Sequence, residues 1–382
     1  MKDLKYHRAK VIAISTGHFL HDIYSSFLAP LLPLLIEKMN ISLGLAGLLD
    51  LIRRIPSLLN PFIGLIADRA ELKYMIILTP AITGISMSLM GLAPNYPTLA
   101  ILLFVAGLSA AFFHVPSPVL INKFSGSKTE KGMSYYMFGG EIARTLGPLL
   151  ITAAVSWWTL EGSYRVMPIG IFASIFLYFY LKDFKYCPLI NTENNSINKT
   201  AQRKKYIPLF AGIGGYLFFS AGMKAFLTLY LVVYLVDKGA SLWVSSISLS
   251  LLQLSGAAGA LFAGFISNKL SNQKILLLSA FISPFLLLGL IYFTDYTIPL
   301  LILIGFSLFV STPIIIAIVQ KQASDRPAFY NSIYMTISFL INSIIVLLFG
   351  ITSDYIGLES TVRISAFMAF ASIAFVFILP RK

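Results

Sequence analysis

Charged residues are scarce in this chain, and their scarcity excludes most soluble architectures. Only 12% of the 382 residues are Asp, Glu, Lys or Arg, whereas 57% are hydrophobic. A soluble domain carries about 25% charged residues, so roughly half of the expected solvated surface is missing. Apolar stretches of about 18 or more residues recur along the whole chain, which indicates a polytopic membrane protein.

Cysteine is nearly absent as well. The single one, Cys187, lies in a polar segment, so no disulfide within the chain and no thiol-rich metal site can form. HExxH, GxSxG and P-loop signatures are missing, as is a long polar domain. These absences argue against a membrane-bound enzyme or sensor, and we expect neither a metal nor a cofactor. The first apolar stretch is long, contains proline and lacks a small-residue cleavage site, so we expect it to be retained as a helix.

Twelve apolar segments are long enough to cross about 30 Å of hydrocarbon at about 1.5 Å per residue. One long polar stretch divides them six and six. We therefore expect a six-helix bundle over residues 1–182, a cytoplasmic linker over 183–206 and a second six-helix bundle over 207–382. The expected spans are 11–36, 44–67, 74–93, 98–122, 132–157, 164–182, 207–236, 242–267, 274–294, 297–320, 328–356 and 361–379.

Basic residues outnumber acidic ones, 29 against 16, for a net charge of +13. An excess of this kind can indicate nucleic-acid binding, but these residues form short clusters between apolar stretches. With the N-terminus placed inside, 21 of the 29 fall in inside segments, four in outside loops and four within spans. Cytoplasmic loops retain Lys and Arg. We therefore expect both termini in the cytoplasm and a multi-pass chain in the inner (plasma) membrane.

The layout of six spans, a basic linker and six spans resembles that of major facilitator transporters. The resemblance implies an all-α membrane fold of two six-helix bundles, each built from inverted triplet repeats. A weak internal repeat agrees with it. The second span ends in Gly64-Leu-Ile-Ala-Asp68-Arg69, and the eighth ends in Gly264-Phe-Ile-Ser-Asn268-Lys269.

The first of these copies, with Lys73 after it, resembles the family's gating motif. There the glycine lets a neighbouring helix approach, while the aspartate latches the cytoplasmic gate. The alternative is an ordinary charged helix end. Asn268 replaces the aspartate in the second copy, so a charged latch would be weaker there.

A more specific resemblance covers the fourth and fifth spans. Ala106–His114 (AGLSAAFFH), Gly132-Met-Ser and Phe138–Leu150 (FGGEIARTLGPLL) are similar to the fosmidomycin-resistance family of major facilitator exporters. The first span, with His18, Asp22 and Pro30-Leu-Leu-Pro33, is similar too. Two positions depart from that family: Val115-Pro-Ser117 replaces a Pro-Glu pair, and Glu141 replaces an asparagine. The resemblance implies drug or metabolite efflux.

The fifth span also resembles the antiporter motif of drug/proton exchangers. Its glycines, with Gly147 and Pro148 at the end of the motif, permit close packing and a bend in the helix. A plain proline kink is the alternative. If the resemblance holds, this helix bends where the two halves rock against each other.

Charges within the spans mark candidate functional sites, because each costs about 2.5–3.5 kcal/mol on insertion scales. Nearly all of them lie in the first half. Counting along each helix places five near one mid-membrane layer: Asp22, Arg53, Arg54, Glu141 and Arg144. His18 lies four residues before Asp22 and shares its helix face, whereas His21 is expected off that face.

We expect Asp22, assisted by His18 or Glu141, to exchange a coupling proton. The expected anion-binding groups are Arg53 or Arg54, Arg144, His114 and Lys224. Each has a structural alternative. Glu141 and Arg144 can form an ion pair within their helix, and His114, which precedes the helix-breaking Pro116 and Pro118, can be a packed histidine. Five aromatic residues are candidates for a cavity lining: Phe112, Phe113, Tyr135, Tyr136 and Phe138.

Together these features predict a proton-coupled exporter of small anionic or amphiphilic compounds that works by alternating access. An importer or exchanger of an organic anion is the alternative. The expected partners are a small-molecule substrate and the lipid bilayer, with no nucleic acid, and the expected oligomeric state is a monomer.

Overall fold

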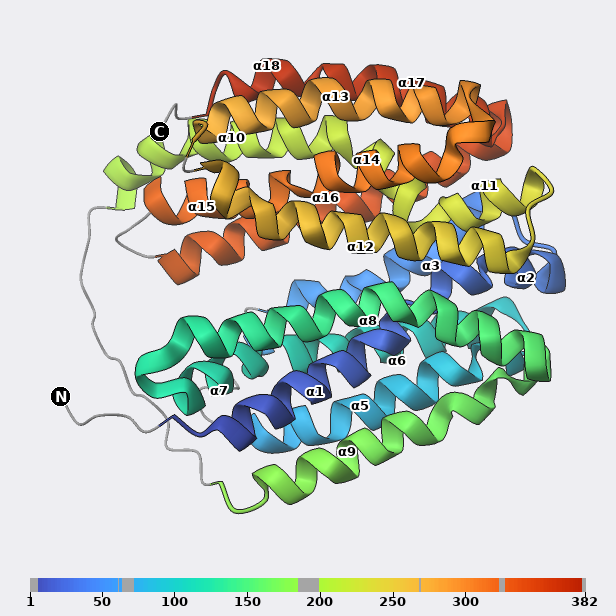
Figure 1. The fold of residues 1–382 in the computed structure, drawn as a ribbon, viewed down its shortest axis with the longest axis vertical. Helices are drawn as coiled ribbons and strands as arrows, with labels where there is room; N and C mark the ends of the chain where they lie inside the picture. Colours follow the sequence, from blue (N-terminus) through green and yellow to red (C-terminus); the bar gives the residue numbers. More distant parts are fainter. Residues whose placement is uncertain are drawn as a thin grey trace. The chain divides into compact units, whose positions relative to one another are not determined.

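The structure is a computed structural model that describes residues 6–60, 62–63, 72–184, 199–267, 269–322 and 327–379. Within these ranges the chain is almost entirely helical and contains no strand (Figure 1). The helices of the first half are α1 (Arg8–Ser25), α2 (Leu28–Met39), α3 (Leu43–Arg54), α5 (Leu72–Ser88), α6 (Tyr96–His114), α7 (Pro116–Ser125), α8 (Thr129–Trp158) and α9 (Met167–Leu181).

The second half has the same character. Its helices are α10 (Lys199–Ala225), α11 (Leu231–Asp237), α12 (Leu242–Ser267), α13 (Asn272–Tyr292), α14 (Thr297–Phe309), α15 (Ser311–Gln322), α16 (Pro327–Ile356), α17 (Leu358–Phe370) and α18 (Ser372–Val376). The all-α multi-pass prediction is confirmed.

Ten segments of the described chain are long and apolar enough to cross a membrane. Two of the twelve expected spans are not among them. The expected span 44–67 begins as α3 and continues through the 3₁₀ turn Ile55–Leu59 into residues outside the described ranges. The expected span 132–157 is α8, whose hydropathy is lowered by Glu141 and Arg144. α8 is a continuous helix, whereas the second span changes from an α-helix to a 3₁₀ turn at Ile55.

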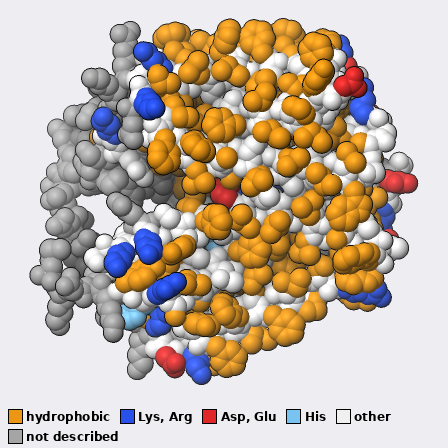
Figure 2. Space-filling model, viewed as in Figure 1, with side chains coloured by type: hydrophobic (Ala, Val, Ile, Leu, Met, Phe, Trp, Pro, Cys, Tyr) orange, Lys and Arg blue, Asp and Glu red, His pale blue; other side chains and the backbone are white. Residues whose placement is uncertain are grey.

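Hydrophobic side chains cover most of the visible surface (Figure 2). Many large ones are more than half exposed, among them Phe172, Phe179, Leu261, Phe265 and Phe367. A soluble monomer rarely exposes apolar area on this scale. Hydrocarbon tails are the solvent that such a surface requires, which agrees with the membrane assignment.

Contacts between helices divide the chain into two compact units. Unit 1 comprises Met1–Ile41, Ile52–Asn191 and Ser241–Ser250, and unit 2 comprises Ser42–Leu51, Thr192–Ala240 and Leu251–Lys382. The first turns of α3 and α12 therefore each pack with helices that come mostly from the other half of the chain. The expected linker lies largely outside the described ranges, and its role stays a prediction.

In unit 1, α1 packs along α5, α8 and α9, and Figure 1 shows α1 running beside α8. Tyr24 holds α1 to the start of α9: its hydroxyl donates to the Val166 carbonyl at 2.6 Å and accepts from the Gly170 N–H at 2.8 Å. Gly84 on α5 faces Gly170, where an added Cβ would lie 3.0 Å from the Gly170 Cα. Since lipid offers no hydrophobic drive between helices, such close backbone approach stabilises the packing.

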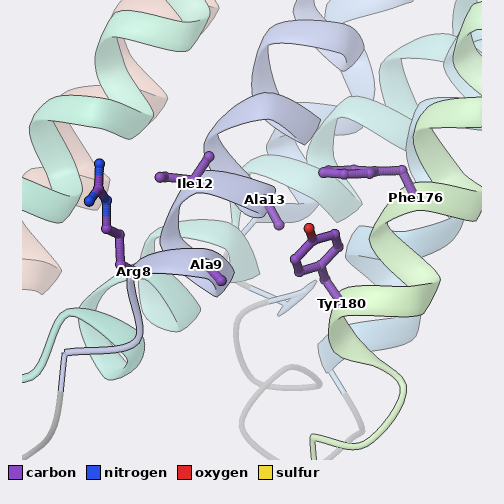
Figure 3. A pocket seen from close by; sticks show the side chains of 6 residues that line it. All are labelled: Arg8, Ala9, Ile12, Ala13, Phe176 and Tyr180. Carbon is purple, nitrogen blue, oxygen red and sulfur yellow. The ribbon is translucent and has the colours of Figure 1, made fainter.

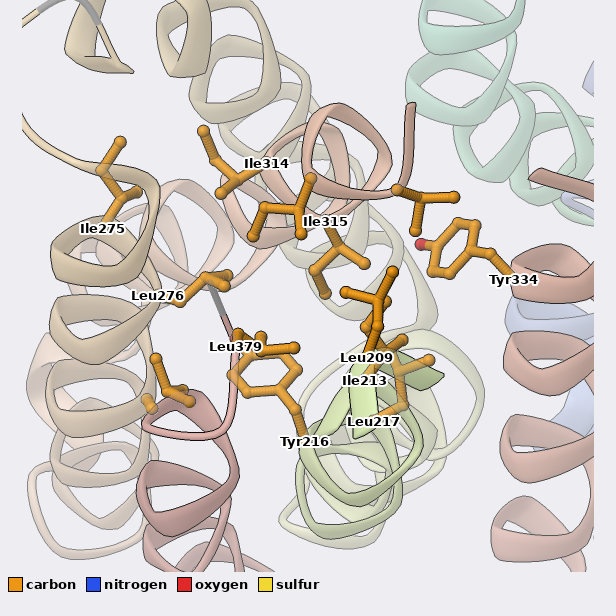
Figure 4. Packing of buried hydrophobic residues seen from close by; sticks show 14 of the residues in the cluster. Leu209, Ile213, Tyr216, Leu217, Ile275, Leu276, Ile314, Ile315, Tyr334 and Leu379 are labelled. Carbon is orange, nitrogen blue, oxygen red and sulfur yellow. The ribbon is translucent and has the colours of Figure 1, made fainter. Parts of the chain in front are cut away.

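In unit 2, α10 packs against α16, α17 and α18. Its residues Leu209, Ile213, Tyr216 and Leu217 meet side chains of α13, α15 and α16 in one buried cluster (Figure 4). Tyr216 is 1% exposed and Ile213 is fully buried. This half of the chain is therefore built on aliphatic and aromatic packing.

The two halves interrupt their helices at corresponding places. The first span breaks between α1 and α2, and the seventh contains a π-helical turn, Phe226–Tyr230, between α10 and α11. The fourth span breaks between α6 and α7, and the tenth between α14 and α15. Proline accounts for the fourth-span break, because Pro116 cannot donate a backbone hydrogen bond. Interrupted helices at matching positions are typical of transporters built from repeats.

Candidate functional site

A single carboxylate, Asp22, is surrounded by three imidazoles within unit 1. Its Oδ2 lies 3.2 Å from His18 Nε2, and its Oδ1 lies 3.0 Å from His21 Nδ1 and 3.1 Å from His114 Nε2. His18, His21 and Asp22 lie on α1, and His114 is the last residue of α6. The cluster occupies the middle of the first membrane span, Arg8–Met39.

Local structure explains how these side chains meet. His18 and Asp22 stand one helical turn apart, as their spacing predicts. His21, expected off the face that His18 and Asp22 share, also reaches the carboxylate, because the ring of a residue next in sequence can turn toward its neighbour. His114 is brought in by the end of α6, where Val115 donates to the Ala111 carbonyl and Pro116 starts a new helix.

Aromatic rings support the histidines from both sides. Tyr136 of α8 stacks on His18 at 3.9 Å between ring centroids, and Phe113 stacks on His21 at 4.5 Å. Of the five aromatic candidates, these two line the cluster. Gly140 of α8 lies directly against the cluster, because a Cβ there would be 2.6 Å from His18 Cε1 and 3.4 Å from Asp22 Oδ2.

Burial differs sharply within the cluster. The side chains of His18 and Asp22 are each 7% exposed and that of His21 is fully buried, whereas that of His114 is 40% exposed. A buried carboxylate requires several hydrogen bonds or a bound proton, because the desolvation penalty is large. His114 is accordingly the most exposed member of the cluster.

The donor atoms of His18, Asp22 and His114 lie within 4.8 Å of one another. The contacts of Asp22 with His18 and His114, 3.2 and 3.1 Å, are short enough for a proton shared between oxygen and nitrogen, and the three groups would also admit a small cation. The expectation that the protein uses no metal stays a prediction.

Glu141 and Arg144 do not join this cluster. They form an ion pair with each other, one turn apart on α8, with side chains 26% and 44% exposed. In the described part of the chain the ionisable partners of Asp22 are its three histidines. Of the five charges predicted near one layer, Asp22 lies among imidazoles, whereas Glu141 and Arg144 form a separate ion pair.

The cations of α3 and α10 take different positions. Arg53 of α3 donates from Nη1 to the Ser25 carbonyl at 3.2 Å, which holds it one turn beyond Asp22 along α1. Arg54 is half-buried in the last turn of α3. Lys224 is half-buried in unit 2, in the last turn of α10 before the π-helical turn.

Comparison with known proteins decides the family. The profile of the Major Facilitator Superfamily matches residues 14–346. The chain belongs to this superfamily. It is a transporter, and the prediction that it is not an enzyme is confirmed.

Two relatives and two solved structures show the range of similarity. The chain is 21% identical to the fosmidomycin resistance protein of Escherichia coli (strain K12), over 96% of this chain and 91% of that one. It is 23% identical to a multidrug resistance protein of Yersinia enterocolitica, over 72% and 69%. The fold is similar to a bacterial homologue of the human lysosomal transporter Spinster (TM-score 0.81, 15% identity, coverage 97% and 96%). It is also similar to a D-xylose–proton symporter (TM-score 0.79, 13% identity, 99% of each chain).

For this major facilitator protein, the expected gating motif is only partly visible. Gly64, Asp68 and Arg69 lie outside the described residues. Lys73 is 5% exposed, and its Nζ donates to the Lys182 and Phe184 carbonyls, both at 2.9 Å. It therefore caps the C-terminal end of α9. At Gly264, in the second copy, an added Cβ would meet no atom of the described residues within 4 Å, so no helix of the described chain approaches closely there.

The fifth-span motif is described in full. Pro148 lies inside the continuous helix α8. Gly147 allows a close approach to α1, because a Cβ there would lie 2.6 Å from the Ile23 carbonyl oxygen. α8 therefore packs closely against α1 about one turn beyond the Asp22 cluster. Close packing is one of the two effects expected of this motif.

Two contributors to the cluster were not predicted from the sequence: the hydroxyls of Thr83 and Ser109. The Thr83 hydroxyl lies 3.0 Å from His21 Nε2 and donates to Ser109 Oγ at 2.8 Å. Both hydroxyls are buried. Their presence in otherwise apolar spans could have identified them, because a hydroxyl within the bilayer must find a hydrogen-bond partner.

The open groove of about 410 Å³ between α1 and α9 is a separate feature (Figure 3). It is lined by Arg8, Ala9, Ile12, Ala13, Phe176 and Tyr180. None of the cluster residues contributes to it. An apolar groove with one arginine offers none of the proton chemistry of Asp22.

Proposed function

We propose that this transporter is a proton-coupled exporter of small anionic or amphiphilic compounds, working by alternating access. The observation that carries the proposal is the buried Asp22 carboxylate with three imidazoles around it, in the middle of the first span. Carboxylates and histidines inside membrane spans commonly form proton relays. Asp22 would take up a proton from outside and release it inside, with His18 as its principal partner.

Glu141 is the second candidate for proton coupling. Its ion pair with Arg144 supports the structural alternative instead, because the carboxylate already has a partner within its own helix. We therefore place the main coupling step at Asp22. A contribution from Glu141 would require the pair to open during transport.

The substrate is proposed to be an anion, such as a phosphonate or carboxylate. Arg53 or Arg54, Arg144 and Lys224 would bind it through charge-assisted hydrogen bonds, with His114 at the exposed edge of the cluster. The names of the two relatives, which refer to resistance to fosmidomycin and to multiple drugs, support efflux. The inner membrane, cytoplasmic termini and a monomeric state belong to the same proposal.

The test is transport by the purified protein in proteoliposomes under an imposed proton gradient. Asp22→Asn is expected to reduce proton-driven transport at least about tenfold, equivalent to about 1.4 kcal/mol of coupling. Glu141→Gln is expected to have a smaller effect. Asp295→Asn, in an exposed 3₁₀ turn, is the matched control and should transport normally. If Asp22→Asn and Glu141→Gln both retained proton-driven transport, the mechanism would be wrong.

Import or exchange of an organic anion is the second candidate, since the same cations would serve it. Everted membrane vesicles with an acidic interior separate the two. An antiporter accumulates substrate in them as protons leave, and a symporter does not. Accumulation that is abolished by Asp22→Asn would support export.

A further inference from the structure

His18 and His21 each have one ring nitrogen that faces away from Asp22. The hydrogen-bond partners of these two nitrogens determine how many protons the cluster holds. His18 Nδ1 lies 2.7 Å from the backbone carbonyl oxygen of Tyr136. A carbonyl can only accept a hydrogen bond, so Nδ1 must carry a hydrogen. A neutral His18 therefore carries its single ring hydrogen on Nδ1, and its Nε2, which faces Asp22, has none.

The same holds for His21, through a chain of hydroxyls. Ser109 donates to the Thr79 carbonyl at 3.0 Å, and Thr83 donates to Ser109 at 2.8 Å. With the Thr83 hydrogen used in this way, its oxygen can only accept from His21 Nε2, 3.0 Å away. A neutral His21 thus carries its single ring hydrogen on Nε2 and donates it to the Thr83 hydroxyl.

Both inner nitrogens then face Asp22 without a hydrogen. His18 Nε2 lies 3.2 Å from Oδ2, and His21 Nδ1 lies 3.0 Å from Oδ1. Two acceptors at such a distance repel each other unless a proton lies between them. Each contact needs one proton, and Asp22 as a carboxylic acid can supply only one of the two.

His114 differs from the other two histidines. Its Nδ1 lies 3.4 Å from the Tyr136 hydroxyl, which can donate as well as accept. A neutral His114 can therefore place its hydrogen on Nε2 and donate to Asp22 Oδ1. It satisfies the carboxylate without an additional proton.

We propose that Asp22, His18 and His21 together hold two protons in this arrangement, and that His21 is a proton-binding residue set by Thr83 and Ser109. The trio then carries a net charge of +1, either as two imidazolium rings with a carboxylate or as one imidazolium with a carboxylic acid. The proposal rests on the proposed proton coupling and adds its stoichiometry: up to two protons bind at this site.

The surroundings contain few other groups that can titrate. α6 presents His114 and α8 presents Tyr136, while Glu141 on α8 is engaged by Arg144. From α3, Arg53 contacts the Ser25 carbonyl. α9 has no charged residue, and the lysines of α5 and α7, Lys73 and Lys123, lie near the opposite ends of those helices from Thr83 and His114. Among the described residues, His114 is therefore the further titratable group in contact with Asp22, and its neutral form satisfies the carboxylate without adding to the proton count of the trio.

The test follows the histidine tautomers by ¹⁵N NMR in the purified protein without substrate. The chain has only four histidines, so single His→Gln variants assign each signal. In the native protein, His21 is expected to be protonated at Nε2 and to titrate together with Asp22. A neutral His21 protonated at Nδ1 alone, in protein with the trio intact, would overturn the proposal.

Two variants remove the constraint without altering the trio. Thr83→Val deletes the acceptor of the His21 Nε2–H, and Ser109→Ala frees the Thr83 hydroxyl to donate to Nε2. In both, His21 should adopt the Nδ1–H form, and proton uptake on acidification should fall from two protons to one. Thr83→Ser is the matched control and should keep two. Unchanged uptake in folded Thr83→Val and Ser109→Ala, verified by circular dichroism, would contradict the proposal.

This experiment is independent of transport. If Asp22→Asn retained proton-driven transport while the tautomers behaved as expected, the proposed function would fail and the proton count would stand. If transport depended on Asp22 but His21 lacked a hydrogen on Nε2, the two-proton assignment alone would fail.

Discussion

The ammonium of Lys38, at the end of α2, lies 2.9 Å from Glu161 Oε1 and donates to the Gly91 carbonyl at 2.6 Å. Unit 2 has a corresponding ion pair, without a bond to a glycine carbonyl among the described residues. Lys238, at the end of α11, lies 2.7 Å from Glu359 at the start of α17. In both units the pair joins the end of the first membrane span of the half to the beginning of its last span. The internal repeat seen weakly in the sequence is thus also present in the contacts.

The two lysines are expected to contribute unequally to stability. Exposed ion pairs are worth about 0–1 kcal/mol, whereas a hydrogen bond from a charged group to a carbonyl is worth about 1.5–3 kcal/mol. Because only Lys38 has both, Lys38→Ala should lower the melting temperature in detergent more than Lys238→Ala. Glu161→Gln should have a small effect that disappears at high salt. Equal effects of the two lysine substitutions would show that the Gly91 contact contributes nothing.

Gly140→Ala should disrupt the Asp22 cluster. The added methyl would lie 2.6 Å from His18 Cε1, so the imidazole or α8 must move, and overpacking of this kind costs about 1–3 kcal/mol. We expect a lower melting temperature and loss of proton-driven transport. Gly214→Ala in α10 is the control, because its Cβ would meet only Ile337 at 3.9 Å. That substitution should be neutral or stabilising by about 0.5–1 kcal/mol. Normal transport by Gly140→Ala would show that the His18 position is not critical.

Asp354→Asn should loosen the start of α3. Both carboxylate oxygens of Asp354, on α16, accept 2.8 Å hydrogen bonds from the backbone N–H groups of Leu43 and Gly44, all within unit 2. An amide has one acceptor oxygen and no charge to complement the helix dipole, so we expect a loss of about 1–2 kcal/mol. Hydrogen exchange at residues 43–46 should accelerate in Asp354→Asn and not in Asp295→Asn. Unchanged exchange would mean that α3 begins stably without this cap.

Lys73→Met should destabilise the end of α9. The substitution leaves the carbonyls of Lys182 and Phe184 without the charged donor that they now share. The expected loss is about 2–3 kcal/mol, measured by thermal unfolding in detergent. Lys73→Gln, which retains one donor group, should lose less. Gln273 in unit 2 sets a precedent, since its side chain donates to the Val376 carbonyl at 3.2 Å. If Lys73→Met altered transport without altering stability, the gating role expected of this residue would gain support.

Local sequence patterns predicted most of the fold. The apolar stretches, the charged gaps between them and the prolines at 116 and 118 are properties of neighbouring residues, so the spans and the break after His114 could be read directly. His18 and Asp22 were also placed together by helical spacing alone. Counting along the helices placed five charges near one layer, but depth along a helix does not say which way a side chain points. Glu141 and Arg144 pair with each other, whereas Asp22 contacts three histidines.

The sequence by itself determined that this chain is a multi-pass membrane protein with its intramembrane charges concentrated in the first half. Hydropathy and charge act residue by residue, so no tertiary contact is needed to establish them. Only the tertiary structure decided what surrounds Asp22. His18 reaches a carbonyl 118 residues away, and His21 reaches a hydroxyl 62 residues away. Those contacts depend on how α5, α6 and α8 are rotated against α1, and helix rotation is set by packing between segments that are remote in the chain.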